Sequence, residues 1–578
     1  MRISLLLRAS SLVAVPVLSL ASQQTVPSVA PSGRRVVACM GQQIGQVTIY
    51  TEAPSVASLR RVPVVARVAR AMHETTQPNL VERFLLFKSG DRCEELRRAE
   101  SERILRAQPY IADADVFIVT NDDGTVDAEI RTIDETAVIF GGSVRARSPN
   151  ISGVLFGNAN LGGQGIYASG AWRTGDGFRD GYSGRLIDHQ FLGKALVAGA
   201  EGVRNPVGGS WRLYAGRPFF TDLQRVAWRA RMGESSGLME LRRPDGTRPE
   251  VELRRRYFEA GAIGRVGVPG RLALFGLSLT GDDEDPGTRL VAADSGMIID
   301  LGPLPRPFSP HHLARVNVLL GVRDIRFVRR RALDAITASQ DVPLGVQIGL
   351  QAGRSTPMLG AEEKDFFLAG DLYVGLSRSE RATTRLQVRS EGRRAVGQAV
   401  WDGVLVTGRL LHQIKISPAN VDELVLDWAG GYRQRMPFQL LLGVHEGGVR
   451  GYEKSNFAGG QRLVARYEHR YSYGAVRNLG DLAFAGFIDA GRQWAGDVLY
   501  GVSTPVKGSV GLSLLASVPS RSTRVWRADV AFPVSGGARS SWTIRFTNID
   551  RTAFAFRDAR DVAAGRELTV PSSIFAWP

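Results

Sequence analysis

Cysteine, histidine and long hydrophobic runs are all scarce in this 578-residue chain. The two cysteines, Cys39 and Cys93, either form a disulfide or remain buried thiols, and the sequence leaves both open. The pair His311-His312 has no third ligand at a useful spacing, so we expect an exposed loop there rather than a metal site. Beyond the N-terminus no uninterrupted apolar stretch reaches about 18 residues, which excludes a transmembrane helix.

Acidic residues are outnumbered, with 57 Asp and Glu against 73 Lys and Arg and a net charge of +16. Because 44% of the residues are hydrophobic, the chain can build a core and is not a disordered basic tail. Arginine binds both carboxylate and phosphate in a bidentate manner, so charge alone allows nucleic acid or lipid phosphate as partner. No common nucleic-acid motif is present. We therefore expect a lipid bilayer with anionic lipopolysaccharide, and no nucleic acid.

Two glycine-containing patterns are the remaining catalytic or cofactor-binding candidates. Gly233-Glu234-Ser235-Ser236-Gly237 matches the nucleophile-elbow pattern, but it lies between β-rich runs and is predicted to be a turn. Gly162-Gly163-Gln164-Gly165 lacks the βαβ context of a phosphate-binding loop. We therefore predict no enzyme, no catalytic residue, no metal and no cofactor.

The N-terminus indicates export. Arg2 and Arg8 precede the apolar run 11–18, and Ser19-Leu20-Ala21 supplies a small-x-small cleavage site. Residues 1–21 are therefore predicted to be a signal peptide, which is too short to be a spanning helix. The Ser/Pro/Gln-rich stretch that follows predicts a linker over residues 22–36. At this chain length two or more modules are expected beyond it.

Residues 37–137 predict a compact α/β domain with the order strand, helix, helix, strand, strand. The strands are predicted at 46–50, 110–120 and 126–132, and the helices at 64–72 and 94–107. Asn121-Asp122-Asp123-Gly124 is a typical hairpin signal between the last two strands. The second helix has few apolar positions among its charges, so one of its faces is predicted to be solvated.

Residues 138–578 predict an all-β region followed by a tail. Apolar and polar residues alternate, as where Trp542, Ile544 and Phe546 are interleaved with polar residues. This pattern fits a soluble sandwich or, with the faces inverted, a transmembrane barrel. Export favours the barrel, because an exported chain without apolar helices can span a membrane only as a closed barrel. At about 25 residues per strand and connection, the region would hold about 16 antiparallel strands.

Three short motifs follow one another near the end of this region. They are Gly447-Gly448-Val449-Arg450-Gly451-Tyr452, then Gly459-Gly460 with Glu468, then Phe487-Ile488-Asp489-Ala490-Gly491. Alternation places Phe487, Asp489 and Gly491 on one face and Phe484 and Ile488 on the other. A carboxylate facing lipid would cost several kcal/mol, so the face of Asp489 should be the lumen.

These motifs, behind one α/β domain, resemble those of the BamA/TamA superfamily of outer-membrane assembly proteins and their two-partner-secretion relatives. Val449-Arg450-Gly451-Tyr452 resembles the loop-6 motif, residues 487–491 resemble the Phe-x-Asp-x-Gly strand, and the α/β unit resembles a POTRA domain. The resemblance implies that loop 6 folds into the lumen and that Arg450 meets Asp489. Glu468 and three neighbouring arginines either contact loop 6 or are ordinary lumen charges. These arginines are Arg462, Arg466 and Arg470.

The resemblance also implies a function in the outer membrane, with the POTRA-like domain in the periplasm. That domain would capture an unfolded outer-membrane or secreted client protein by adding a strand to a sheet edge, and the barrel would insert or translocate it. A dedicated exporter of one partner, and a passive porin or surface antigen without a client, remain as alternatives.

Two features depart from the superfamily pattern. A single POTRA-like unit leaves the docking of accessory assembly partners open. About 30 residues follow Phe546, including the charged stretch Arg557–Arg566. Either the final strand is misplaced or a tail covers the closing seam of the barrel.

Overall fold

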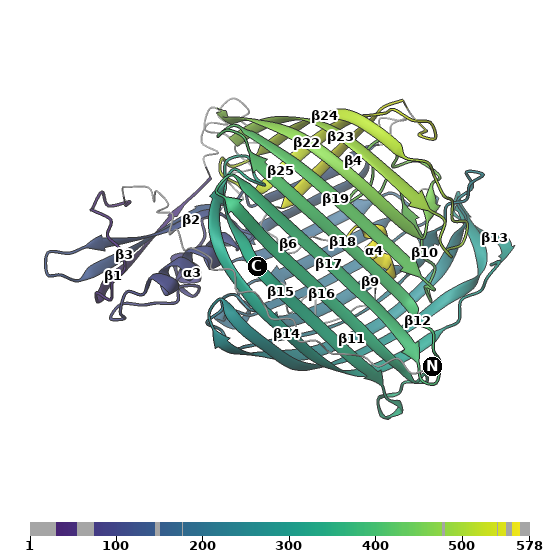
Figure 1. The fold of residues 1–578 in the computed structure, drawn as a ribbon, viewed down its shortest axis with the longest axis horizontal. Helices are drawn as coiled ribbons and strands as arrows, with labels where there is room; N and C mark the ends of the chain where they lie inside the picture. Colours follow the sequence, from purple (N-terminus) through teal and green to yellow (C-terminus); the bar gives the residue numbers. More distant parts are fainter. Residues whose placement is uncertain are drawn as a thin grey trace, which may run out of the picture.

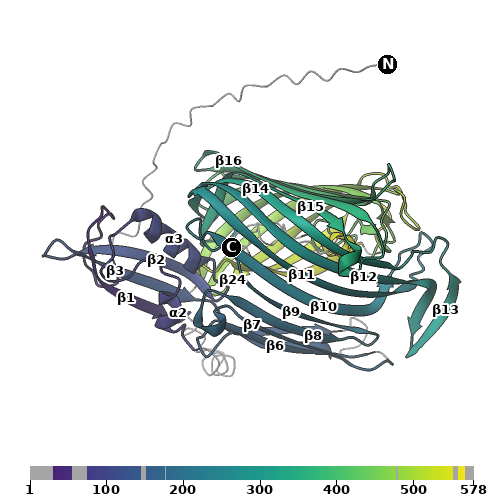
Figure 2. The same ribbon diagram turned by 90° about the horizontal axis from the view of Figure 1, so that it is seen from below.

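A small α/β domain lies at one end of a large β-barrel (Figure 1 and Figure 2). The structure is a computed structural model, which describes residues 30–54, 74–144, 151–175, 177–476, 480–539, 541–550 and 558–566. The predicted signal peptide (1–21) and the first predicted helix (64–72) lie outside the described residues. Within these ranges no helix is both long enough and apolar enough to cross a membrane.

The described part of the α/β domain is a three-stranded sheet with two helices. Its elements are β1 (Ile44–Glu52), α2 (Pro78–Glu82), α3 (Glu95–Arg106), β2 (Ile111–Thr120) and β3 (Val126–Asp134). The sheet order is β1-β3-β2, with β1 parallel and β2 antiparallel to β3. The three strands and the second helix lie where the sequence predicts them. The β2–β3 hairpin turns at Gly124, whose φ of +82° favours glycine.

Helix α3 is amphipathic, but the charged residues of its C-terminal half are not in water. Ile104 and Leu105 pack into the core of the domain. Glu95 in the first turn and the basic residues in the last turn suit the helix dipole. Arg103 and Arg106 are both buried. The prediction of a solvated face therefore holds at the start of the helix, where Glu94 and Glu95 are more than half exposed, and is wrong for its C-terminal half, where Arg103 and Arg106 have partners on the barrel.

The segment before β1 belongs to the α/β domain. Cys39 and Cys93 form a disulfide with a Cα–Cα distance of 5.1 Å, which ties this segment to the start of α3. Residues 30–36, predicted as the end of the linker 22–36, pack on the sheet instead, where Val36 forms a β-bridge with Val119. A single bridge leaves no periodic pattern, so the sequence carries no signal for this contact.

Among the described residues, twenty wall strands pair side by side into a closed antiparallel barrel, and β26 lies next to β4. The wall strands are β4 (Val138–Val144), β5 (Ile151–Leu161), β6 (Ile166–Arg173), β7 (Gly181–Asp188), β8 (Val197–Arg204), β9 (Gly209–Arg217), β10 (Val226–Glu240), β11 (Glu250–Val268), β12 (Arg271–Asp294), β14 (His311–Arg331), β15 (Ser339–Ser355), β16 (Asp365–Ser379), β17 (Ala382–Ala395), β18 (Asp402–Lys415), β19 (Asn420–Tyr432), β22 (Gln461–Val476), β23 (Gly480–Trp494), β24 (Lys507–Ser517), β25 (Arg524–Pro533) and β26 (Thr543–Asp550). Two short 3-10 helices, η2 (Phe191–Gly193) and η3 (Pro357–Leu359), lie in connections. Strand β13 (Met297–Pro303) extends the outer end of β12 as a hairpin.

The all-β barrel behind a small α/β domain is the predicted fold class, but the expected number of about 16 strands is too low. The estimate assumed long connections. Several connections are much shorter, such as residues 269–270 between β11 and β12 and residues 380–381 between β16 and β17. More strands therefore fit into the same length of chain.

The outer face of the barrel is apolar and the inner face is polar. On β24, Val510, Leu512 and Leu514 are exposed on the outside, whereas Ser509 and Ser513 are buried inside. On β23, Ile488 is 58% exposed and Asp489 is 1% exposed. The predicted inversion of the faces is confirmed. A closed sheet also pairs the backbone groups along its strands, which is what a hydrocarbon environment demands.

The three patterns weighed as catalytic or metal-binding candidates lie at different places in the barrel. Residues 233–237 lie inside β10, so the predicted turn is wrong, since glycine and serine there occupy a strand. His311 is buried at the start of β14, where its Nδ1 lies 2.5 Å from Oε1 of Glu363, so the predicted exposed loop pair is wrong for it. Residues 162–165 form the β5–β6 connection, and Gly163 accepts a backbone hydrogen bond from Gln77. In the part of the chain that is described, no group of three His, Cys, Asp or Glu could hold a metal.

The described part of the C-terminal tail lies inside the barrel. Strand β26 follows the predicted alternation, so the final strand is not misplaced. Helix α4 (Arg560–Gly565) packs in the lumen on side chains of β18 and β19 (Figure 1). The expectation that this tail covers the closing seam is wrong for the described residues, because their partners lie on the wall around β18.

Candidate functional site: the inward loop and its anchor on the barrel wall

The connection between β19 and β22, residues 433–460, folds into the barrel and is called the inward loop below. Within it, β20 (Leu440–Leu441) pairs with β21 (Ala458–Gly459). Val449 and Tyr452 are fully buried and pack with a valine of β22. Loops at strand ends usually lie on the surface, so a loop with a buried tip needs a specific anchor.

Arg450, at the tip of the inward loop, is bound to Asp489 of β23. Nε of Arg450 donates to Oδ2 at 2.7 Å, and Nη2 donates to Oδ1 at 2.6 Å. The backbone N–H of Arg450 also donates to Oδ2 at 3.1 Å. Both side chains are buried. A bidentate pair fixes the orientation of the guanidinium as well as its position, so it locates the loop on one point of the wall.

Phe487 and Glu468 complete the surroundings of Arg450. The two residues are direct partners in the β22–β23 register. Cζ of Arg450 lies 3.4 Å from the centroid of the Phe487 ring, which gives a cation–π contact. Nη1 of Arg450 donates to Oε2 of Glu468 at 3.4 Å. The structure thus brings together the arginine, aspartate, glutamate and phenylalanine of the three sequence motifs.

Three further charged residues belong to the same cluster, and the sequence analysis did not single them out. Arg527 donates to Glu468 at 3.0 Å and to Asp529 at 2.6 Å. Arg545 donates to Asp529 at 2.9 Å. Three guanidinium groups therefore face three carboxylates, and this balance offsets the cost of burying charge. Alternation in β25 and β26 already assigns these residues to the lumen, but it does not show which strands they meet there.

Two glycines make room for the tip of the inward loop. Gly451 has a φ of +91°, and a Cβ there would lie 2.9 Å from Cγ of Pro533. A Cβ at Gly491 would lie 2.5 Å from Cγ2 of Val449. The small residue at the end of the Phe-x-Asp-x-Gly strand is thus a place where the loop approaches the wall too closely for a side chain.

The remaining motif residues hold the second half of the inward loop, from its tip to its return to the wall. The hydroxyl of Tyr452 donates to the carbonyl of Ser535 at 2.6 Å. The backbone N–H of Gly460 donates to the carbonyl of Trp494 at 3.0 Å. A Cβ at Gly459 would lie 2.3 Å from that same oxygen. The Gly-Gly pair therefore lets the loop return to the wall against the end of β23.

The three arginines of β22 have different partners. Arg462 donates to the carbonyl of Leu441 in the inward loop at 2.5 Å. Arg466 binds Asp427 of the neighbouring strand β19. Arg470 donates to backbone carbonyls of the connection between β14 and β15. Of these three, Arg462 is the one for which a hydrogen bond to the inward loop is found, alongside Glu468.

The charged face of α3 binds the mouth of the barrel. Arg106 pairs with Asp341 of β15 at 2.8 Å. Arg329 of β14 lies 2.9 Å from Glu102 and 2.9 Å from Asp115. Burial raises the pKa of Glu102, but the surrounding guanidinium groups outweigh it and hold that pKa below its usual range. These buried ion pairs fix the α/β domain on the barrel.

One of the two edges of the α/β sheet is covered. Residues 35–37 hydrogen-bond to the backbone of β2 over its C-terminal half. Arg98 of α3 donates to the carbonyl of Val116 at 2.9 Å. Arg106 donates to the carbonyl of Ala114 at 2.9 Å. A strand can be added only to a free edge, so a client could pair with β2 only after these groups leave it.

The structure of this chain is similar to several solved barrel structures. No family model and no curated protein sequence matches the chain. The chain is similar to BamA from Haemophilus ducreyi lacking POTRA domains 1-3, with 13% identity and a TM-score of 0.36 over 89% of this chain and 85% of that chain. It is also similar to CdiB from Escherichia coli, with 11% identity and a TM-score of 0.41 over 88% and 76% of the two chains. For CdiB from Acinetobacter baumannii the identity is 11% and the TM-score 0.40, over 88% and 74%. Likenesses of this size carry no argument about function, and the barrel itself is established by its own strand pairing.

Proposed function

We propose that the protein is an outer-membrane barrel of the BamA/TamA superfamily that inserts or translocates other proteins. The observation that carries the proposal is the inward loop, whose arginine is bound to Asp489 on the lumen wall at 2.6 and 2.7 Å. Val449, Arg450, Gly451 and Tyr452 act together as the anchor of this loop. We propose that the tip of the loop moves as a unit when this ion pair and the hydrogen bond of Tyr452 to Ser535 break.

The surface of the barrel supports a location in the outer membrane of a Gram-negative cell. Its outward side chains are apolar, and such a surface would be unfavourable in water but suits lipid. The α/β domain would lie in the periplasm at the entrance of the barrel. The arginine excess suits the phosphate groups of anionic lipopolysaccharide.

The mechanism we propose consists of binding and passage, without bond-making. An unfolded client would pair with an edge of the α/β sheet by β-augmentation. That edge would be β1, or β2 once residues 35–37 and the side chains of Arg98 and Arg106 are displaced. The client would then reach the barrel, where the inward loop leaves its anchor to make room.

Depletion of the protein, followed by quantitative proteomics of the outer membrane and the secreted fraction, tests this function. Loss of many outer-membrane proteins supports insertion, and loss of one secreted protein supports a dedicated exporter. An unchanged proteome, with a steady large conductance of the purified protein, would identify a passive pore and overturn the proposal. Complementation with Arg450→Ala should fail, whereas Arg492→Ala, on the outer face of β23, should restore function.

A further inference from the structure

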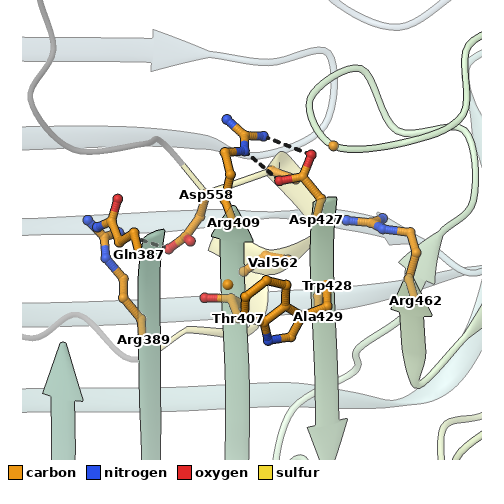
Figure 3. Close-up of a pocket in the computed structure, with 13 residues that line it drawn as sticks. Gln387, Arg389, Thr407, Arg409, Asp427, Trp428, Ala429, Arg462, Asp558 and Val562 are labelled. Carbon is orange, nitrogen blue, oxygen red and sulfur yellow. Dashed lines mark hydrogen bonds and ion pairs between the residues drawn. The ribbon is translucent and has the colours of Figure 1, made fainter. Parts of the chain in front are cut away.

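The tail segment 558–566 is bound to the lumen wall by its two carboxylates. The backbone N–H of Leu441 donates to Oδ2 of Asp561 at 2.8 Å, and Arg462 pairs with the same carboxylate at 2.5 Å. Asp558 lies 3.3 Å from Nη1 of Arg389. Figure 3 shows Asp558 beside Arg389, and Val562 between the strands that carry Thr407 and Ala429. Each carboxylate therefore has its own arginine on the wall.

Arg566, the last described residue of the segment, is basic and binds acidic and hydroxyl groups. Nη1 of Arg566 lies 2.7 Å from Oε2 of Glu391, and Nη2 donates to the hydroxyl of Thr407 at 2.8 Å. Nε pairs with Asp558 of the segment itself at 2.8 Å. The wall is thus complementary to the segment at both of its ends.

A small apolar contact lies between these charges. Val562 and Ala559 are buried against Leu405, Ala429 and a phenylalanine of the inward loop. By contrast, Ala563, the next residue of α4, is exposed. One valine on one face of α4 therefore supplies most of its apolar burial.

The contact has the properties of an exchangeable complex. Helix α4 has six residues, and a helix of this length is not stable by itself in water, so the wall must support it. Ion pairs supply most of its contacts, and their net stabilisation is small because both partners must lose water. A cavity of about 50 Å³ beside the segment is large enough for water.

The end of β26 and the segment 558–566 lie toward opposite ends of the lumen. Strand β26 ends beside the α/β domain, since its partner residue Arg524 contacts the carbonyl of Pro109. The segment 558–566 instead contacts Arg462, the second residue of β22, at the end of the barrel from which the inward loop emerges.

We propose that the wall formed by β17, β18, β19 and β22 is a binding site for a short peptide with two carboxylates about one helical turn apart and an adjacent apolar side chain, and that the protein's own C-terminal segment occupies it as a dissociable plug. This inference goes beyond the proposed function and does not depend on which protein passes. When the segment leaves, the space that α4 occupies in the lumen becomes free. The inward loop then loses the hydrogen bond between Leu441 and Asp561. Ion flow through the barrel should increase.

Single-channel recording in planar bilayers tests the plug with two matched variants of the full chain. Val562→Asp places a carboxylate in the apolar contact, and Ala563→Asp places the same group on the exposed face of the same helix. We expect several-fold higher conductance for Val562→Asp and the wild-type value for Ala563→Asp. Equal conductance of Val562→Asp and wild type, or an equal rise in both variants, would overturn the proposal. Resistance of the folded barrel to heat on gels checks that each variant is folded.

Addition of the segment in trans tests the binding site itself. A chain that ends at Asp550 should conduct like Val562→Asp, and a synthetic peptide of residues 556–568 should return its conductance to the wild-type value. The same peptide with Val562→Asp should have no effect. Failure of the wild-type peptide to close the channel would contradict the site. No client is present in these recordings, so their outcome is independent of any defect in client insertion or export.

Discussion

Asp489 accepts three hydrogen bonds from Arg450, two from the guanidinium and one from the backbone N–H. The contribution of the backbone makes the pair asymmetric. Without its side chain, residue 450 still has one donor for the carboxylate. Without Asp489, the guanidinium stays charged and keeps the ring of Phe487 and the longer contacts to Glu468 at 3.4 Å and to Asp529 at 3.8 Å.

This asymmetry predicts that Asp489→Ala is more harmful than Arg450→Ala. We expect Asp489→Ala to lower the free energy of unfolding of the barrel by about 3–5 kcal/mol, the usual cost of a stranded buried charge. Arg450→Ala should cost less, because the backbone N–H of residue 450 can still donate to the carboxylate of Asp489. Urea unfolding in lipid vesicles measures both values, with Arg492→Ala on the outer face of β23 as control. Losses no larger than that of the control would mean that the pair does not hold the loop.

Gly491 and Gly486 lie on the same strand, and Gly486 serves as the control for a substitution at Gly491, where the inward loop packs on the wall. A Cβ at Gly491 would overlap Val449, whereas a Cβ at Gly486 would meet nothing within 4 Å. Gly491→Ala should therefore destabilise the barrel by about 1–3 kcal/mol through overpacking, and Gly486→Ala should be nearly neutral. The double variant Gly491→Ala with Val449→Ala should recover part of the loss in the same urea experiment. Similar effects of the two single substitutions would contradict the packing of the loop on the wall.

Arg329 and Arg330 are neighbours on β14 with different roles. Arg329 reaches three carboxylates of the α/β domain, those of Glu102, Asp113 and Asp115, so Arg329→Ala should weaken docking of that domain by about 2–3 kcal/mol. Arg330→Ala should leave docking unchanged. The distance distribution between one spin label on the domain and one on the barrel reports this, and it should broaden only for Arg329→Ala. A narrow distribution in both variants would show that other contacts suffice.

The position of the tail predicts a disulfide that the natural chain lacks. A Cβ at Gly447 would lie 3.8 Å from Cβ of Ala559, a distance typical of disulfides. Gly447→Cys combined with Ala559→Cys should therefore cross-link on oxidation, which mass spectrometry detects. The φ of +87° at Gly447 adds about 1–2 kcal/mol of strain, for which Gly447→Cys alone is the control. Absence of the cross-link in a folded protein would contradict the lumen position of the tail.

Asp134 predicts a pH dependence at the joint between the two domains. Its carboxylate accepts hydrogen bonds from the hydroxyl and backbone N–H of Thr76 at 2.6 and 2.7 Å, and Asn160 of the barrel donates to that hydroxyl. Burial raises the pKa of Asp134 to about 6, which these hydrogen bonds only partly offset.

The sign of this effect follows from the raised pKa. The folded state holds the proton more tightly than the unfolded chain, whose Asp pKa is about 3.9. The stabilisation is therefore complete below about pH 4 and is lost as pH rises through 6, by at most about 3 kcal/mol. As the pH rises through 6, residues 74–134 should therefore become less protected against protease in urea. Asp134→Asn should remove most of this pH dependence. Asp123→Asn, in the exposed hairpin turn, should keep it.

The inward and outward faces of the strands could be predicted from the sequence, because alternation is a local property of an extended chain. On β23 it assigned Ile488 to the outside and Asp489 to the lumen, as the structure has them. The hairpin between β2 and β3 could also be predicted, because its turn residues Asn121-Asp122-Asp123-Gly124 are a local signal. The contacts of Arg527 with Glu468 and of Asp529 with Arg450 could not be predicted, since these partners lie on a strand and in a loop far away in the sequence.

The charged residues of α3 show why contacts between distant parts of the chain could not be predicted from local patterns. Arg106 in a helix pattern has the same local signature whether it meets water or Asp341, which lies 235 residues further along the chain. The same holds for Asp561, whose partner Arg462 lies 99 residues before it. By itself, the amino-acid sequence determined an all-β region with inverted faces behind an α/β domain, because these follow from the spacing of neighbouring residues. Only the tertiary structure decided the number of strands, the docking of the domain and the place of the tail, because closure of the barrel brings distant charges within hydrogen-bonding distance.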